Sequence, residues 1–161
     1  MSRVLVHFSC GAASAVALKV AVLKYGAEAE VEAIYCAGVE RDEHPDNARF
    51  LADVERWVGR PVKKLYHPKY SGVDDVFLAT RFVVGPRGAA CTRVLKREVR
   101  EAYQRPDDRH VLGLTADEGK RIAAFAARNP AVECVWLLAA AGITKADCYR
   151  ILTAAGIELP E

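Results

Sequence analysis

The sequence has no C-x-x-C pair. Its five cysteines, which are dispersed and odd in number, are Cys10, Cys36, Cys91, Cys134 and Cys148. This spacing argues against a disulfide framework, a zinc knuckle and an iron–sulfur cluster. The N-terminal apolar run, residues 3–8, is also too short for a signal peptide or a membrane span. We therefore expect a cytoplasmic protein with no membrane partner and no iron–sulfur cofactor.

The sequence also has little net charge. Lysine and arginine number 23 and aspartate and glutamate 21, which gives +2 at pH 7. This charge does not indicate a polyanionic partner, and the aromatic residues are not interleaved with the basic ones as nucleic-acid stacking platforms would be. Any phosphate group must then be held by local features. The 161 residues, 52% of them hydrophobic, predict one folded domain over residues 1–161.

Apolar runs of strand length alternate with stretches of helical period, a pattern typical of βαβ units. Five runs are rich in valine, leucine, isoleucine and aromatic residues: Val4–Phe8, Val31–Cys36, Val62–Tyr66, His110–Leu114 and Val132–Leu138. Strands of this composition are covered on both faces. We therefore predict an α/β fold with one doubly wound, mainly parallel, five-stranded sheet and helices on both faces, in a Rossmann-like arrangement.

Helical periods separate and follow these runs. They cover residues 13–25, 45–58, 92–103, 115–128 and 144–155, and glycine follows several of them, as it does at helix ends. The third has a basic face made of Arg93, Lys96, Arg97 and Arg100. The stretch 69–90, with three glycines and a proline, is the least regular. It predicts a lid-like segment with a short helix near Val73–Thr80.

A turn of small residues follows the first predicted strand. It reads Ser9-Cys10-Gly11-Ala12-Ala13-Ser14 and leads into the first predicted helix. In doubly wound sheets, ligands bind beyond the carboxyl ends of the strands. Small side chains let main-chain amides approach an anion at a helix N-terminus. The turn therefore predicts a phosphate site made of residues 9–14.

This turn is neither of the common glycine-rich phosphate motifs, G-x-G-x-x-G and G-x-x-x-x-G-K-[ST]. It resembles the S-G-G-x-D-S signature of the PP-loop superfamily, the adenine nucleotide alpha-hydrolase-like proteins, at Ser9, Gly11 and Ser14. The resemblance implies an adenine nucleotide cofactor, ATP or phosphoadenosine phosphosulfate (PAPS). Cys10 replaces the first glycine of the signature, and Ala13 replaces an aspartate that helps to hold the metal. That second replacement argues against magnesium-dependent ATP cleavage.

A second segment resembles the PAPS reductases of that superfamily. Cys91 and Lys96 match the C-x-x-x-L-K stretch of that family, and the segment from Gly38 to Asp46 takes the place of its acidic, proline-containing loop. The resemblance implies catalytic positions at Cys91 and Lys96 and a nucleotide contact at Gly38. A cysteine at the start of a basic helix suits a reactive thiolate, whereas simple packing is the alternative interpretation of Cys91.

A third segment is similar to the G-x-R-x-x-E-S-x-x-R stretch of the same family. Gly113, Glu118 and Arg121 match it, and Thr115 replaces its first arginine. The resemblance implies that these three matching residues contact the nucleotide. Thr115 and Glu118 also form the T-x-x-E capping box of a helix, so Glu118 has two interpretations. We expect no metal ligands among the side chains of this chain.

The matching segments cover most of the chain, but the sequence does not contain the C-terminal E-C-G-L-H motif with the nucleophilic cysteine of thioredoxin-dependent PAPS reductases. We therefore expect a short PAPS reductase-like protein that binds an adenine nucleotide and acts at its phosphate or sulfate group. One alternative is a nucleotide-binding module without chemistry, completed by a second copy or a partner subunit. Another is an ATP pyrophosphatase or adenylyl-transfer enzyme of sulfur or nucleoside modification.

Overall fold

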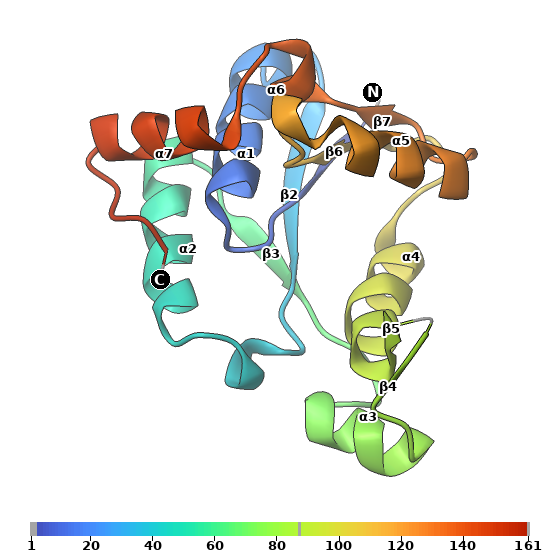
Figure 1. Cartoon of the computed structure of the whole chain (residues 1–161). Coiled ribbons are helices and arrows are strands. Elements are labelled where there is room, and N and C mark those ends of the chain that lie inside the picture. The colour runs from blue at the N-terminus through green and yellow to red at the C-terminus, as the bar shows by residue number, and fades with distance from the viewer. Residues whose placement is uncertain (1–2, 87, 161) are drawn as a thin grey trace.

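Five parallel strands lie at the centre of the computed structural model, which describes residues 3–86 and 88–160 (Figure 1). Across the sheet they follow the order β3 (Val62–Leu65), β2 (Glu30–Cys36), β1 (Arg3–His7), β6 (Arg109–Leu112) and β7 (Cys134–Val135). Neighbouring strands pair in parallel throughout. The chain builds outward from β1 to β3 and then returns to the other side of β1. This confirms the predicted α/β, Rossmann-like, doubly wound sheet.

Helices cover both faces of this sheet. One face carries α1 (Ala12–Tyr25), α2 (Asp46–Val58), α6 (Leu137–Ala140) and α7 (Lys145–Ala154), and α1 contacts the other three. On the opposite face, Val99 of α4 (Val99–Tyr103) packs against Leu5 and Ile34. Successive strand residues point to opposite faces, so Val4 lies in the α1 layer while Leu5 lies in the α4 layer. Burial on both sides explains the nearly continuous apolar runs.

The helix ends follow signals in the sequence. α2 ends at Gly59, whose φ of 75° is the left-handed conformation that glycine adopts readily. α7 begins with a capping box, because the Thr144 hydroxyl accepts from the Asp147 amide at 3.2 Å and Asp147 accepts from the Thr144 amide at 2.8 Å. A short 3-10 turn, η3 (Ala116–Glu118), leads into α5 (Gly119–Arg128).

The fifth strand of the sheet is shorter than predicted. Only Cys134–Val135 pairs with β6, and Leu137–Ala140 forms helix α6 instead of the end of a strand over Val132–Leu138. A short apolar run does not distinguish a strand from a buried helical segment, and leucine and alanine favour helix. Leu137 and Leu138 still enter the core. The pattern therefore predicted their burial correctly and their conformation wrongly.

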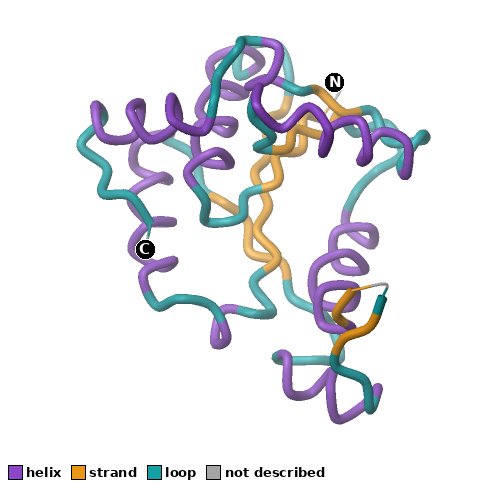
Figure 2. Tube along the Cα trace, viewed as in Figure 1, coloured by secondary structure: helices purple, strands orange, loops and turns teal. Residues whose placement is uncertain are grey.

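The basic helix spans the predicted range, but its first part, Thr92–Glu98 (η2), is π-helical before α4 begins. π-helical turns are rare and occur often at functional sites. The preceding segment contains α3 (Val73–Thr80), as predicted. It also contains an antiparallel hairpin of β4 (Val84–Gly85) and β5 (Gly88–Ala89), which the sequence did not predict (Figure 2). Closure of this segment as a lid stays a prediction.

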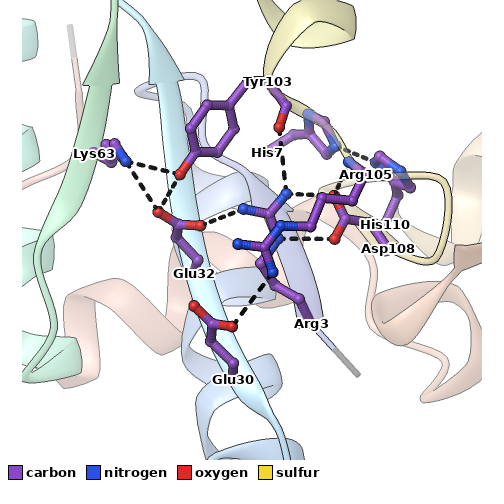
Figure 3. Close-up of polar contacts among 9 residues, drawn as sticks. All are labelled: Arg3, His7, Glu30, Glu32, Lys63, Tyr103, Arg105, Asp108 and His110. Atoms are coloured by element: carbon purple, nitrogen blue, oxygen red, sulfur yellow. Dashed lines mark hydrogen bonds and ion pairs between the residues drawn. The ribbon is translucent and has the colours of Figure 1, made fainter. Parts of the chain in front are cut away.

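A buried ion-pair network joins the amino ends of the central strands (Figure 3). Arg3, which is 2% exposed, donates to both carboxylate oxygens of Asp108 at 2.8 and 2.6 Å and to Glu32 at 2.8 Å. The Tyr103 ring lies 5.0 Å from the guanidinium, and its hydroxyl donates to Glu32 at 2.5 Å. Burial opposes the charge of Asp108, but hydrogen bonds from Arg3 and the Arg105 amide outweigh it and lower the pKa of Asp108. The network links β1, β2, β6 and α4.

Candidate functional site

The switch point of the sheet lies between β1 and β6. The chain leaves β1 toward β2 on one side and comes back to β6 on the other, an arrangement that opens a crevice beyond the carboxyl ends of both strands. A cavity of about 490 Å³, which we call the turn cavity, lies there. A second cavity of about 480 Å³, the rim cavity, adjoins it. His7 and Ser9 line both, so the two cavities meet where β1 ends.

The predicted phosphate turn forms one wall of the turn cavity. From this turn come Ser9, Gly11, Ala12, Ala13 and Ser14. Besides His7, the remaining lining comes from the last residue of β6 and the chain after it, from α7 and from the tail: Leu112, Gly113, Leu114, Glu118, Arg121, Lys145, Tyr149 and Pro160. The structure thus brings the turn together with the three residues of the third matching segment, Gly113, Glu118 and Arg121.

Five successive main-chain amides of this turn, those of residues 10–14, have no hydrogen-bond partner in the described chain. The first bond of α1 runs from the Ala15 amide to the Gly11 carbonyl at 3.1 Å. The Ser14 hydroxyl accepts from the Ser9 amide at 3.1 Å and donates to the Gly11 carbonyl at 2.8 Å. Unpaired amides at the start of a helix, in the wall of a cavity, are typical of an anion site.

Cys10 gives the turn its bend. Its φ of 55° is left-handed, which is uncommon for a residue other than glycine, whereas Gly11 is extended with φ −107° and ψ 155°. The left-handed conformation thus falls on the residue that replaces the first glycine of the signature. The Cys10 side chain is 4% exposed, and burial raises its pKa to about 11. Cys10 is therefore a protonated, packed thiol at neutral pH.

Gly113 allows the chain after β6 to approach α1 closely. A Cβ at this position would lie 2.6 Å from the Ser14 amide nitrogen and 2.8 Å from the Ala13 carbonyl carbon. Gly11 differs, because a Cβ there would meet only the Ser9 hydroxyl oxygen, at 3.8 Å. Gly113 is therefore required for the close approach of the chain after β6 to the phosphate turn, and these two segments form the two walls of the turn cavity. Gly11 is not required for packing, and its missing side chain keeps the cavity open beside the amides.

Glu118 serves the capping box and lines the turn cavity as well. One carboxylate oxygen accepts from the Thr115 amide at 3.0 Å and lies 3.0 Å from the Thr115 hydroxyl, and the other pairs with Arg121. Burial opposes its charge, but these partners outweigh it and lower the pKa of Glu118. The capping interpretation is confirmed, and contact with a nucleotide stays a prediction.

The rim cavity has an apolar floor and a basic wall. The floor comes from the ends of β1 and β2: Phe8, Ile34, Tyr35 and Cys36. The wall comes from the basic helix: Thr92, Arg93, Lys96, Arg97 and Arg100. The basic face predicted from the sequence therefore faces a cavity. Arg100 has a side chain only 23% exposed, and its one ion pair within the described chain is a 3.9 Å contact with Glu101.

Lys96 is paired with a residue that the sequence reasoning missed. Its ammonium lies 2.9 Å from Glu43, whose other oxygen accepts from the Tyr35 hydroxyl at 2.5 Å and from the side-chain Nδ2 of Asn47 at 3.0 Å. Burial opposes the charge of Glu43, but these donors outweigh it and lower its pKa, while burial and the carboxylate raise the pKa of Tyr35. Glu43 belongs to the acidic loop that resembles the family pattern. Its contacts with Lys96, Tyr35 and Asn47 distinguish it from the other acids of that loop, and no local sequence pattern reveals them.

Cys91 and Gly38 lie outside the lining of both cavities. Cys91 packs on a small apolar cluster that includes Val76 and Leu95, and a Cβ on Gly38 would lie 3.5 Å from the Leu95 side chain. These contacts agree with the packing interpretation of Cys91. Its catalytic role, like the nucleotide contact of Gly38, stays a prediction.

Two histidines, which the sequence showed only as scattered residues, meet at the wall between the cavities. His7 Nε2 lies 2.9 Å from His110 Nδ1, and the rings stack with centroids 5.2 Å apart. Burial away from water is the main cause that lowers the pKa of both histidines, and it lowers that of His7 to about 3. The positive charge of Arg100 lowers both pKa values further. The pairing depends on the β1–β6 register, which no local pattern reveals.

We expect acid to destabilise the fold through this pair. In the unfolded chain each histidine has its ordinary pKa of 6.5, so below that pH the unfolded state binds protons that the folded state excludes. The stabilising contribution of His7 is then fully present above pH 6.5 and falls by about 1.4 kcal/mol per pH unit below it. Urea unfolding of the wild-type chain should show a loss of at least about 1.4 kcal/mol between pH 7.5 and pH 5.5, and His110 adds to this loss in the same direction. His7→Gln should lose less stability over this range, and an equal loss in both chains would contradict this assignment.

No protein-family model and no curated protein matches this chain. Within residues 3–86 and 88–160, no three histidine, cysteine, aspartate or glutamate side chains gather into a group able to hold a metal ion. None of the helices in that part of the chain combines the length and the apolar character needed to cross a membrane. The fold and the site define a Rossmann-like α/β protein with unpaired amides in the crevice at its switch point.

Proposed function

We propose that this chain binds an adenine nucleotide, such as ATP or PAPS, as a PAPS reductase-like member of the PP-loop superfamily. The observation that carries this proposal is the row of unpaired amides at residues 11–14 in the wall of the turn cavity. Phosphate oxygens accept hydrogen bonds from such amides, and the N-terminus of α1 adds positive potential. The superfamily positions Ser9, Gly11 and Ser14 all lie in this wall.

The rim cavity suits the nucleoside part of such a ligand. Its floor is formed by Phe8, Ile34 and Tyr35, each at most 4% exposed, and an apolar floor favours contact with a planar base. Because the two cavities meet at His7 and Ser9, a nucleotide with its base on this floor and its phosphates on the turn would occupy both. The cations of the basic helix line the rim cavity, so they would then lie beside the nucleoside part of the ligand.

A second candidate function is nucleotide binding without chemistry. It is favoured by the position of Cys91, which packs in an apolar cluster and lines neither cavity. It is also favoured by Ala13, whose methyl group stands where the superfamily signature has a carboxylate. Such a module would need a second copy or a partner subunit to supply the reactive group.

The test of nucleotide binding is Gly11→Val, examined by thermal unfolding with ATP. ATP at about 100 times its dissociation constant should stabilise the wild-type fold by about 2.7 kcal/mol, a rise of several degrees in the midpoint. Gly11→Val should fold normally, because its backbone is extended and its Cβ is unhindered. The valine side chain should nevertheless obstruct the amides, so the shift should disappear.

Gly119→Val is the matched control for this test. A Cβ at Gly119 meets nothing within 4 Å, and Gly119 does not line either cavity. This variant should keep the whole ATP shift. If ATP stabilises the Gly11 and Gly119 variants equally, the turn is not the phosphate site.

A further inference from the structure

The His7–His110 pair lies between the proposed phosphate site and the interior of the sheet. His7 precedes Ser9 of the turn by two residues and lines both cavities. His110, from β6, is 4% exposed and lines neither. Figure 3 shows the two rings side by side, close to the buried network of Arg3 and Asp108. A ligand in either cavity therefore has His7 as a neighbour, and His7 has a buried hydrogen-bond partner behind it.

The pair can take up one proton without losing its internal hydrogen bond. Each neutral imidazole carries one N–H, so the 2.9 Å contact joins one N–H to one bare nitrogen. If the shared proton is on His7 Nε2, His7 Nδ1 is bare. An added proton then binds His7 Nδ1 and turns it from an acceptor into a donor, while His7 Nε2 still donates to His110 Nδ1.

The free energy of adding that proton to the histidine pair depends on the charged groups of the neighbouring elements. Those that act directly on the two rings are Arg100 of α4, Asp108, which precedes β6, and Arg3 of β1. Titratable groups that line the cavities beside His7 are Cys36, Glu43, Arg93, Lys96, Arg97, Glu118, Arg121, Lys145 and Tyr149; Cys134 pairs with His110 in the sheet. Asp108 favours the proton, but both of its oxygens already accept from Arg3. Arg100 opposes the proton, and its only ion pair in the described chain is long.

We propose that the His7–His110 pair takes up a proton when an oxyanion enters the cavities beside His7. This inference rests on the proposed function, because it needs an anion at that site. The anion offsets the charge of Arg100, which is the cation that most opposes protonation of the pair, and it accepts a hydrogen bond from the protonated His7. Binding of a phosphate or sulfate group and protonation of His7 then favour each other, so affinity rises as pH falls.

The experiment follows the histidine ring resonances of the wild-type chain by NMR between pH 8 and pH 5, in sodium sulfate and in sodium chloride of equal ionic strength. Sulfate is the probe because its own charge stays constant over this range. It should raise the protonated fraction of His7 about tenfold at the acid end, which corresponds to one unit of pKa. His67, which stacks on Tyr70 outside the two cavities, is the internal control and should be unchanged.

Amide resonances of residues 10–14, recorded in the same samples, separate this inference from the function it rests on. If sulfate shifts these amides while His7 titrates as in chloride, the proton uptake is wrong and the anion site stands. If sulfate changes neither the amide resonances nor the titration of His7, both the anion site and the proton uptake are wrong. Arg100→Gln provides a second measurement: His7 should be more protonated in chloride than in the wild-type chain, and sulfate should add less. Identical His7 titrations in the variant and the wild-type chain would overturn the part assigned to Arg100.

Discussion

Replacing Arg3 with methionine is expected to lower the free energy of unfolding by about 3–5 kcal/mol, because it leaves the buried carboxylate of Asp108 without its ion pair. Arg3 and Asp108 are both 2% exposed, and two hydrogen bonds join them. Desolvation makes a lone buried charge far more costly than a missing surface pair. Urea unfolding at neutral pH measures the effect.

Two comparisons make the Arg3 result specific. Arg105→Met removes a guanidinium whose side chain is 56% exposed and which lies 3.8 Å from Glu30, so it should cost less than about 1 kcal/mol. The double variant Arg3→Met/Asp108→Leu should recover at least half of the loss, because no unpaired charge then remains at position 108. If the double variant is no more stable than Arg3→Met, the lost free energy of unfolding comes from packing and not from an unpaired charge.

Gly113→Ala is expected to lower the free energy of unfolding by about 1–3 kcal/mol, the usual cost of inserting an atom into a packed site. The added methyl group would lie 2.6 Å from the Ser14 amide nitrogen and 2.7 Å from Ser14 Cα. Because these are backbone atoms at the start of α1, relief requires movement of the phosphate turn itself. The variant should therefore also lose most of its thermal stabilisation by ATP.

Gly119→Ala is the control for this substitution. Its backbone is already helical and a Cβ there has open space, so alanine should be neutral or stabilising by up to about 1 kcal/mol. Urea unfolding of both variants tests the contrast. Equal stability of the Gly113 and Gly119 variants would mean that the two walls of the turn cavity can separate without cost.

Local patterns predicted the elements of this fold well where one physical signal dominated. The apolar runs of β1, β2, β3 and β6 and the capping residue Thr115 correspond to the observed elements. The pattern failed at Leu137–Ala140, where burial was clear and the choice between strand and helix was not. It also gave no sign of the π-helical turns at Thr92–Glu98, because a stretch of seven residues is too short to reveal a change of period.

Local sequence patterns predicted only part of the candidate site. The residues of the phosphate turn are adjacent in the chain, so their small size was visible together. The close approach of Gly113 to Ser14, the pairing of Glu43 with Lys96 and the contact of His7 with His110 each depend on how distant segments align. Such contacts follow from sheet register and helix packing, which a single sequence does not display.

The conformation of Cys10 limits what evolution can place at that position. Glycine would relieve a left-handed backbone that costs an L-residue about 1–2 kcal/mol, but it would leave a hole where the thiol is now buried. Valine would fill the space, yet its branched side chain is poorly suited to a positive φ. A compact, unbranched and weakly polar side chain satisfies both demands. Homologous chains with this bend should therefore vary less at position 10 than at any exposed residue of the same loop.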